Sequence, residues 1–273
     1  MTLASADFDY IRELVFDQTA IVLEPGKEYL VESRLVPVAR DEGVEGVGEL
    51  VASLRRTPDR TLRTRVIEAM TTNETSFFRD VAPFELLRTT VVPELIERRA
   101  LNRALNIWCA AASSGQEPYS VAMILNDHFP ELASWSVRIL ATDLSTAVIE
   151  RARNAVYSQF EVNRGLPATM LVKHFDREGT SFALKDEIKK AIEFDILNLI
   201  RPWPSLPIMD IVFIRNVLIY FDDETKRNIL GRVHNVLCPG GYLFLGGAES
   251  TMHLHDGFER VPAERAGCYR RVK

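Results

Sequence analysis

The sequence predicts a doubly wound α/β fold, with a parallel sheet covered by helices, preceded by a small all-helical domain. Three observations lead to this prediction. From residue 104 onward, short apolar runs alternate with amphipathic helical segments. Residues 1–70 show helical spacing of apolar side chains and no alternation with a period of two. Residues 156–192 interrupt the alternation with short runs typical of a small β insertion.

The composition is that of an ordinary globular protein. The 273 residues include 33 Lys and Arg against 38 Asp and Glu, a net charge of −5, and 47% are hydrophobic. These values exclude a disordered or fibrous chain, and the acidic balance disfavours nucleic acid as a partner. No stretch is long and apolar enough to span a bilayer, and the N-terminus lacks a signal core. We therefore expect a cytoplasmic protein without direct membrane insertion.

Cysteine and histidine usage predicts no metal site. Cys109, Cys238 and Cys268 are an odd number, widely spaced, and form no CxxC pair, which argues against a disulfide framework and against zinc. His253 and His255 flank Leu254, but a metal would need more ligands, so we interpret both as surface residues.

The N-terminal domain, residues 1–70, is expected to contain several short helices. Phe8, Ile11 and Leu14 recur at three-residue steps, and a second apolar pattern runs through residues 27–40. A Gly-rich stretch ends that pattern, and another short helix begins near residue 50. Residues 71–103 are then expected to be a linker. Within it, residues 82–100 look helical, and Pro93 is expected to break or kink that helix.

Residues 104–273 carry the pattern of a parallel sheet. Strand-like runs are nearly continuous in apolar residues, which indicates burial on both faces, and right-handed crossovers then favour a doubly wound arrangement. We read residues 156–192 as a β insertion of two small hairpins. The expected strands are 104–111, 137–142, 193–196, 208–214 and 241–245, and the expected helices are 118–128, 145–154 and 222–237.

Ligands of such sheets bind beyond the carboxyl ends of the strands, where the strand order reverses. Four of these ends carry polar side chains or a glycine loop. The first is followed by the loop from Ala112 to Pro118, the second by Asp143, the third by Asn198 and the fourth by Arg215 and Asn216.

The first loop predicts a nucleoside ligand without phosphates. It contains one glycine, Gly115, so it is not a dinucleotide fingerprint, and the neighbouring carboxylate of Glu117 would repel a diphosphate. Asp143 is placed to accept hydrogen bonds from ribose hydroxyls. Two plainer interpretations remain open: an ordinary strand–helix turn for the loop, and an N-cap role for Asp143 in competition with Ser145.

The linker opens with TTNETSFFRD, residues 71–80. By composition alone, this is a capped helix start, with Thr72 or Asn73 as the cap and the two phenylalanines in the core. The occurrence of this segment together with specific motifs later in the sequence favours a functional role for it. Those motifs are WCAAASSGQEPYS, ATDLS, and FIRNVLIYFD followed by LCPGGYLFLGGAES.

Together these segments resemble the CheR family of chemotaxis receptor methyltransferases, in the same order and over nearly the whole chain. The resemblance implies a helical N-terminal domain, a linker and a Rossmann-like domain that binds S-adenosylmethionine and releases S-adenosylhomocysteine. It implies methyl transfer to glutamate side chains on the cytoplasmic methylation helices of methyl-accepting chemoreceptors. The cofactor-binding residues that it implies are Asn73, Thr75, Arg79, Glu117, Asp143, Asn198, Leu199, Arg215 and Asn216.

The sequence departs from the family pattern in two places. Ala112, Ser114 and Gln116 stand where the family loop has Cys, Thr and its first Glu, which are small changes that leave Glu117 in place. The β insertion lacks the longer Gly-rich loop of members that grip a receptor's C-terminal pentapeptide. We therefore expect methylation without that tether.

Methyl transfer to a glutamate carboxylate requires orientation of that carboxylate rather than a general base. A glutamate side chain is an anion at neutral pH, and the sequence offers no catalytic dyad or triad. Arg79 and Tyr220 are the candidates to orient the incoming carboxylate, although Tyr220 also fits a core position. An N-terminal cluster of arginines is a candidate docking surface for acidic receptor helices, or alternatively a solvated face. Its members are Arg55, Arg56, Arg60, Arg63 and Arg65.

Three other functions fit the sequence less well. A nucleic-acid amine methyltransferase is disfavoured because RNVLIYF lacks the prolines of an (N/D)PP(Y/F) motif. A small-molecule carboxyl methyltransferase fits the α/β half but not the N-terminal domain. An adaptor that binds S-adenosylmethionine without turnover is disfavoured by the intact set of site residues.

Overall fold

A computed structural model describes residues 3–57 and 59–272, and their contacts divide the chain into two units. The helical unit extends to Thr72 and also takes in Tyr220–Thr225. The α/β unit comprises Asn73–Ile219 and the chain from Lys226 onward, so it holds most of the predicted linker. The outermost residues of the predicted domains, 1–2 and 273, lie outside the described residues.

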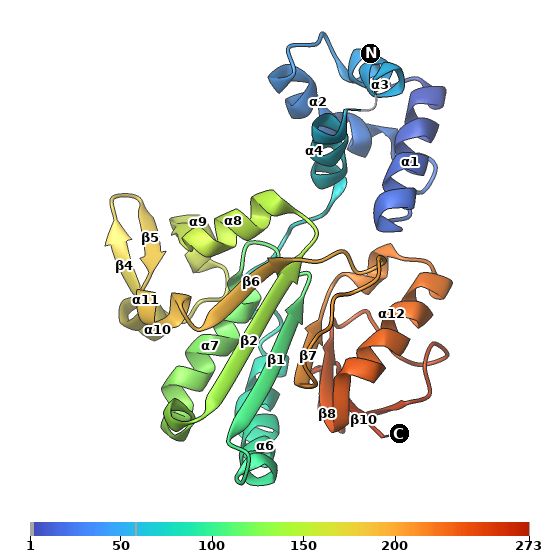
Figure 1. The fold of residues 1–273 in the computed structure, drawn as a ribbon. Coiled ribbons are helices and arrows are strands. Elements are labelled where there is room, and N and C mark those ends of the chain that lie inside the picture. Colours follow the sequence, from blue (N-terminus) through green and yellow to red (C-terminus); the bar gives the residue numbers. More distant parts are fainter. Residues whose placement is uncertain (1–2, 58, 273) are drawn as a thin grey trace. The chain divides into compact units, whose positions relative to one another are not determined.

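The described part of the helical unit contains four helices around an apolar core, three of which the periodicity predicted (Figure 1). Ile11, Leu35 and Leu50 are fully buried in it. One helix was not foreseen: the segment after Asp59, where the Asp59 carboxylate accepts the backbone N–H groups of Thr61 and Leu62 and so caps a helix. The helices are α1 (Ser5–Thr19), α2 (Glu28–Asp41), α3 (Val47–Arg56) and α4 (Arg60–Met70).

The helix predicted over residues 82–100 forms, and Pro93 distorts it without ending it. It comprises α5 (Ala82–Leu86), the π-helical turn η1 (Leu87–Val91) and α6 (Val92–Arg99). Pro93 has no N–H to donate and its ring crowds the preceding turn. The wider π turn, in which the Val92 N–H donates to the Leu87 carbonyl, relieves that crowding.

The α/β unit contains a seven-stranded sheet in the order β6-β2-β1-β7-β8-β10-β9. The first five are parallel and match the predicted strands, which confirms the fold class. The last two are antiparallel and were not predicted. Their bounds are β1 (Ala104–Ala110), β2 (Ser136–Asp143), β6 (Ile192–Ile196), β7 (Met209–Ile214), β8 (Leu237–Leu245), β9 (Phe258–Arg260) and β10 (Cys268–Arg271).

Helices cover both faces of the sheet. In Figure 1, α6 and α7 (Gln116–His128) lie behind the sheet and α12 (Asp223–Val236) lies in front of it. A further helix, α8 (Thr146–Asn154), connects β2 to the insertion. In the sheet, β2 and then β6 lie on one side of β1, whereas β7 and then β8 lie on its other side. The strand order therefore reverses between β1 and β7.

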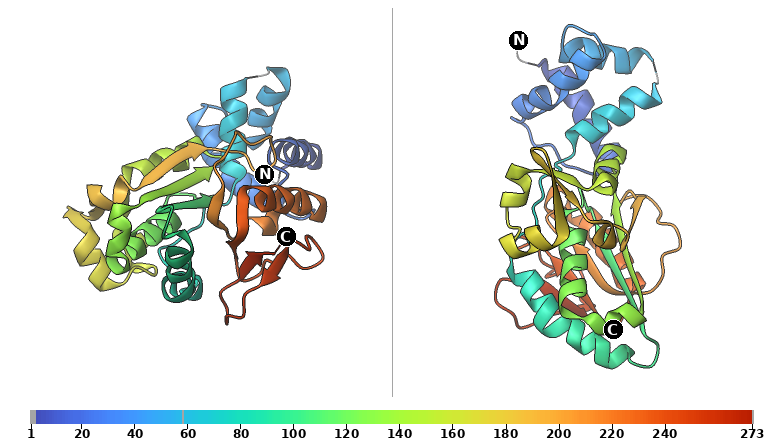
Figure 2. Two further views of the ribbon diagram at one scale, coloured as in Figure 1. Left: turned by 60° about the horizontal axis from the view of Figure 1, so that its bottom comes forward. Right: turned by 90° about the vertical axis from the view of Figure 1, so that its left-hand side faces the viewer.

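The β insertion is a three-stranded antiparallel sheet, β3-β5-β4, with short helices (Figure 2). The expected hairpin between β4 (Phe175–Glu178) and β5 (Ser181–Leu184) is present. The second expected hairpin is wrong: its first part forms a helical turn, and its last part is β6, which pairs with β2. Acidic residues at the start of that turn favour a helix. The other elements are β3 (Val156–Ser158), α9 (Gln159–Asn163), α10 (Ala168–His174) and α11 (Asp186–Lys189).

None of the described helices is both long and apolar enough to cross a membrane.

Candidate functional site

The carboxyl ends of four adjacent strands bring the predicted site residues of the α/β unit to one edge of the sheet. In register, Ala110 of β1 lies beside Thr142 of β2 and Ile214 of β7, while Asp143 lies beside Ile196 of β6. The residues that follow these strands therefore border a common space, at the place where the strand order reverses.

The loop between β1 and α7 has a backbone that alternates in sign of φ. Ala111, Ser113 and Gly115 all have positive φ, with Gly115 at +92°. A Cβ on Gly115 would lie 3.0 Å from the Tyr119 ring and 3.0 Å from the Ala152 Cβ. Glycine alone combines a readily adopted positive φ with the absence of a Cβ at this position. The loop can therefore pack closely against α7 and α8 while its backbone faces the strand ends.

Asp143 joins this loop to the turn after β2. Its carboxylate accepts the Ser113 N–H at 2.9 Å and the Ser145 N–H at 3.0 Å, and the residue is buried. The N-cap of α8 is Ser145, whose Oγ accepts the Val148 N–H. Asp143 is therefore not the N-cap, and it fixes two of the loops that border the strand ends.

Glu117 and Arg215 form a largely buried ion pair. One Arg215 Nη donates to the Glu117 carboxylate at 2.8 Å, and the other donates to the Asp80 carboxylate at 2.8 Å and to the Arg79 carbonyl at 3.0 Å. The Arg215 side chain is 1% exposed. Burial raises the pKa of Glu117, and the charge of Arg215 opposes that rise.

The segment TTNETSFFRD is not a helix start, so that interpretation is wrong; the chain instead turns sharply at Phe78 and Asp80, which both have positive φ. Phe77 and Phe78 are buried as expected. The segment is held against the glycine loop: the Asn73 carbonyl accepts the Ser113 hydroxyl at 2.8 Å.

Polar groups from the same segment and from the β6 loop complete this edge. Arg79 is half-buried and donates to the Glu74 carbonyl at 3.1 Å, and Thr75 is half-buried. After β6, the Asn198 side chain accepts the Ile200 N–H at 3.0 Å, and Leu199 is buried.

A residue that the sequence reasoning missed organises the turn after β7. Glu249 is buried, and its carboxylate accepts the N–H groups of Asn216 and Val217. Asn216 has a φ of +59°. The available signal was an acidic residue in LGGAES, four positions after the end of the apolar run, because buried carboxylates require partners.

Tyr220 and the arginine cluster belong to the helical unit. Tyr220 ends the 3₁₀ turn η3 (Leu218–Tyr220) and is half-buried, and its carbonyl accepts the Val22 N–H at 2.9 Å. Two arginines are already paired: Arg55 with Asp7 at 2.9 Å, and Arg65 with Asp41 at 2.9 Å and with Glu42. Three are exposed and form no ion pair with a described residue: Arg56, Arg60 and Arg63.

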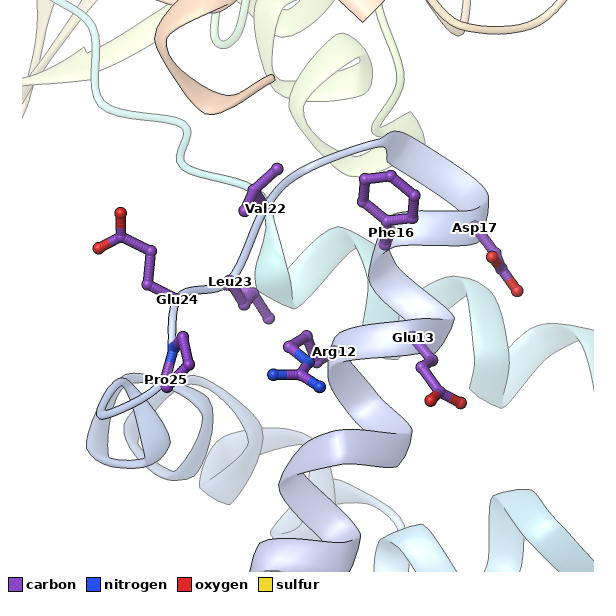
Figure 3. Close-up of a pocket in the computed structure, with 8 residues that line it drawn as sticks. All are labelled: Arg12, Glu13, Phe16, Asp17, Val22, Leu23, Glu24 and Pro25. Carbon is purple, nitrogen blue, oxygen red and sulfur yellow. The ribbon is translucent and has the colours of Figure 1, made fainter. Parts of the chain in front are cut away.

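The helical unit also holds a surface hollow of about 390 Å³ between α1 and the segment that follows it (Figure 3). Figure 3 shows Phe16 on α1, with Val22 and Leu23 on that segment. None of the predicted site residues lines it.

No group of three His, Cys, Asp or Glu side chains that could hold a metal ion occurs in residues 3–57 and 59–272. His253 is exposed, as expected. The surface interpretation of His255 is wrong, because its ring packs against His234 with centroids 4.9 Å apart and it is half-buried.

Comparisons with known proteins agree over almost the full length. Residues 6–71 match the model of the CheR methyltransferase all-alpha domain, and residues 73–266 match that of the CheR methyltransferase SAM binding domain. The chain is 43% identical to chemotaxis protein methyltransferase 1 of Pseudomonas aeruginosa, over 99% of each chain. It is 40% identical to chemotaxis protein methyltransferase Cher2 of Pseudomonas putida, over 96% of each. Among solved structures, PKMT2 from Rickettsia typhi in complex with AdoHcy aligns with 64% of this chain and 26% of its own, at 13% identity and a TM-score of 0.37.

Proposed function

This chain belongs to the CheR family of chemotaxis methyltransferases, and from that premise we propose that it methylates glutamate side chains of chemoreceptors. It is an enzyme whose methyl donor is S-adenosylmethionine. Its general substrate is a chemoreceptor, as expected for chemotaxis methyltransferases. We further propose that the methylated groups are glutamate carboxylates on the cytoplasmic methylation helices of these receptors.

The residues at the strand ends fit such a cofactor. Its ribose hydroxyls and ammonium group are donors, and acceptors are supplied by the buried carboxylate of Asp143 and the Glu117 carboxylate, whose side chain is 13% exposed. The loop around Gly115 brings backbone close to a ligand without a cradle for phosphates. We assign cofactor binding to Asn73, Thr75, Arg79, Glu117, Asp143, Asn198, Leu199, Arg215 and Asn216.

Within this set, Arg215 acts through its partners. Its guanidinium is buried and already donates to Glu117, Asp80 and a backbone carbonyl. We infer that it holds Glu117 in place for the ligand, and that its own backbone and the following Asn216 border the cofactor.

The mechanism rests on orientation. S-adenosylmethionine supplies an electrophilic methyl group on a sulfonium. The receptor glutamate is already ionised, so the protein needs to align its oxygen rather than remove a proton. Alignment of this kind contributes roughly 7–11 kcal/mol in well-oriented reactions. We assign the orienting hydrogen bonds to Arg79 and Tyr220.

The receptor docks, in this proposal, on basic side chains of the helical unit. Arg56, Arg60 and Arg63 are exposed at the end of α3 and the start of α4. Arg55 and Arg65 contribute less than the sequence suggested, because carboxylates of the same unit neutralise them. Acidic methylation helices would be attracted over a screened distance of about 10 Å.

Two finer points complete the proposal. Only Gly179 and Thr180 separate β4 from β5, which supports methylation without a grip on a receptor pentapeptide. Cys109, Cys238 and Cys268 are all free thiols and buried, which supports a reducing compartment and hence the cytoplasm.

The test is transfer of a radiolabelled methyl group from S-adenosylmethionine to receptor-enriched membranes. Label released as methanol by mild alkali is expected, because carboxylate methyl esters hydrolyse. Alkali-stable label would refute ester formation. Receptors that lack their C-terminal pentapeptide should be labelled at the same rate as intact ones, and a large loss of rate would refute tether independence.

The same assay separates the rivals. An adaptor would bind S-adenosylhomocysteine but give no labelled product with any acceptor. A small-molecule carboxyl methyltransferase would label low-molecular-weight extracts and leave receptors unlabelled.

A further inference from the structure

The turn that follows β7 is held by one acidic side chain from a different part of the chain. Glu249 lies after β8, and both oxygens of its buried carboxylate accept backbone N–H groups. The donors are Gly246 at 2.6 Å, Asn216 at 2.8 Å, Val217 at 2.9 Å and Ile219 at 3.3 Å. A carboxylate that accepts this many backbone amides fixes the backbone around it.

The surrounding geometry depends on that carboxylate. Asn216 has a φ of +59°, in the left-handed region that residues other than glycine adopt uncommonly. A Cβ on Gly246 would lie 2.6 Å from the Asn216 side-chain nitrogen and 2.7 Å from the Glu249 carboxylate. Because Gly246 has no side chain, Asn216 and Glu249 can approach it closely. The Glu249 carboxylate then accepts the hydrogen bonds that hold this arrangement.

We propose that Glu249 is a positioning residue for methyl transfer. It fixes the turn from Arg215 to Ile219, which presents Asn216 to the cofactor. Glu249 itself touches neither cofactor nor substrate. This inference rests on the proposed site role of Asn216.

The proximity of Glu249 to the rest of the site supports this role. The negative charge of Glu249 contributes to the raised pKa of Glu117, after burial and against the effect of Arg215. Glu249 therefore lies near enough for its charge to act on the Glu117–Arg215 pair. Loss of that charge would change the electrostatic environment of Glu117 as well as the hydrogen bonds of the turn after β7.

The experiment compares Glu249→Gln with Glu259→Gln, an exposed glutamate on β9 that serves as the matched control. Glutamine has one acceptor oxygen and turns an NH₂ group toward the remaining amides. At a temperature where both variants are folded and at saturating S-adenosylmethionine, we expect kcat of Glu249→Gln to fall about tenfold or more. S-adenosylhomocysteine affinity, measured by calorimetry, should fall as well. The control should match the unmodified protein in both.

A spectroscopic readout separates positioning from simple loss of stability. In the unmodified protein, the amide protons of Val217 and Ile219 should resonate downfield, as donors to a carboxylate, and should move upfield in Glu249→Gln. A variant that melts earlier but keeps full kcat and full S-adenosylhomocysteine affinity while folded would overturn the proposal.

If Glu249→Gln does not fold, Glu249→Asp decides the question. It keeps the charge but is one methylene shorter, so we expect kcat to fall and unchanged kcat would overturn the proposal. Failure of the proposed function would look different, because the unmodified protein would then bind S-adenosylhomocysteine but leave receptors unlabelled.

Discussion

The Arg215 guanidinium meets the Glu117 carboxylate at 2.8 Å across the point where the strand order reverses. Arg215 directly follows β7, and Glu117 lies in the first turn of α7 after β1. The same guanidinium donates to Asp80 of the TTNETSFFRD segment. One buried cation thus joins two strand ends and that segment, and because a buried charge is costly without partners, the three parts are constrained together.

Glu117 makes cofactor binding depend on pH. Burial raises its pKa above the ordinary value of 4.5, with Arg215 in opposition. Only the ionised carboxylate accepts hydrogen bonds on both oxygens, so affinity for S-adenosylhomocysteine should fall as pH falls through that raised pKa. Calorimetric titrations from mildly alkaline to acidic pH measure this. Glu117→Gln should bind more weakly and lose the dependence, and an equal slope in the variant would contradict the prediction.

The same shift has a consequence for stability, with a definite sign. Because the pKa of Glu117 is higher in the folded than in the unfolded chain, the folded state holds the proton more tightly. This contribution to stability is complete below the ordinary pKa and is lost as pH rises through the folded pKa. Melting temperatures measured over that interval should therefore decline less steeply in Glu117→Gln than in the unmodified protein.

Gly165 should be far less tolerant of substitution than Gly179. Both have positive φ, at +88° and +61°. A Cβ on Gly165 would lie 2.1 Å from the Phe77 carbonyl oxygen, whereas nothing lies within 4 Å of one on Gly179. Gly179→Ala then carries only the backbone penalty, about 1 kcal/mol. Gly165→Ala must also displace the backbone at Phe77.

Chemical denaturation measures the two free energies of unfolding. We expect Gly165→Ala to lose about 2–4 kcal/mol, more than its control, and to bind S-adenosylhomocysteine more weakly, since Phe77 lies in the segment that carries Asn73. Equal losses of unfolding free energy in the two variants would contradict the prediction, because the backbone at Phe77 would then have moved without destabilising the protein.

The sequence predicted the parts of the site that follow from strand order. Apolar runs that end in Asp143 or Arg215 had to place those residues at one edge, because parallel strands share direction. What it missed depends on contacts distant in sequence. Nothing near Glu249 indicates that three of its amide donors come from residues 216–219, and β10 is recognisable only from its pairing with β8.

Local patterns failed where tertiary contacts overrode them. The polar run before Phe77 reads as a helix cap, but the Asn73 carbonyl instead accepts the Ser113 hydroxyl, and the Arg79 carbonyl after it accepts a hydrogen bond from Arg215. Similarly, the arginines of α3 and α4 read as one basic cluster, and only the structure separates the paired Arg55 and Arg65 from the rest.

Asp143 should be essential for cofactor binding. Its carboxylate holds the Ser113 and Ser145 amides, and hydrogen bonds to a charged group contribute about 1.5–3 kcal/mol each. Asp143→Ala removes both, together with the proposed acceptor for ribose, so calorimetry should show a severe loss of S-adenosylhomocysteine affinity. Ser145→Ala is the matched control, because it removes the N-cap of α8, at about 1 kcal/mol of stability, and leaves the carboxylate. Unchanged affinity in Asp143→Ala would remove Asp143 from the site.

The exposed arginines should govern receptor methylation without affecting the cofactor. Arg56, Arg60 and Arg63 form no ion pair with any described residue, so their charge is available to an acidic partner. Replacing all three with Gln should slow receptor methylation several-fold at low salt, and the difference should shrink as salt screens the attraction.

The control for that prediction is the double variant Arg55→Gln and Arg65→Gln, which removes the same type of charge from intramolecular pairs. Exposed pairs of this kind contribute about 0–1 kcal/mol, so the double variant should lose a little stability and keep its methylation rate. Both variants should bind S-adenosylhomocysteine as the unmodified protein does. If the triple variant methylates receptors at the unmodified rate in low salt, the charges of Arg56, Arg60 and Arg63 do not recruit the receptor, and docking must be sought on another surface.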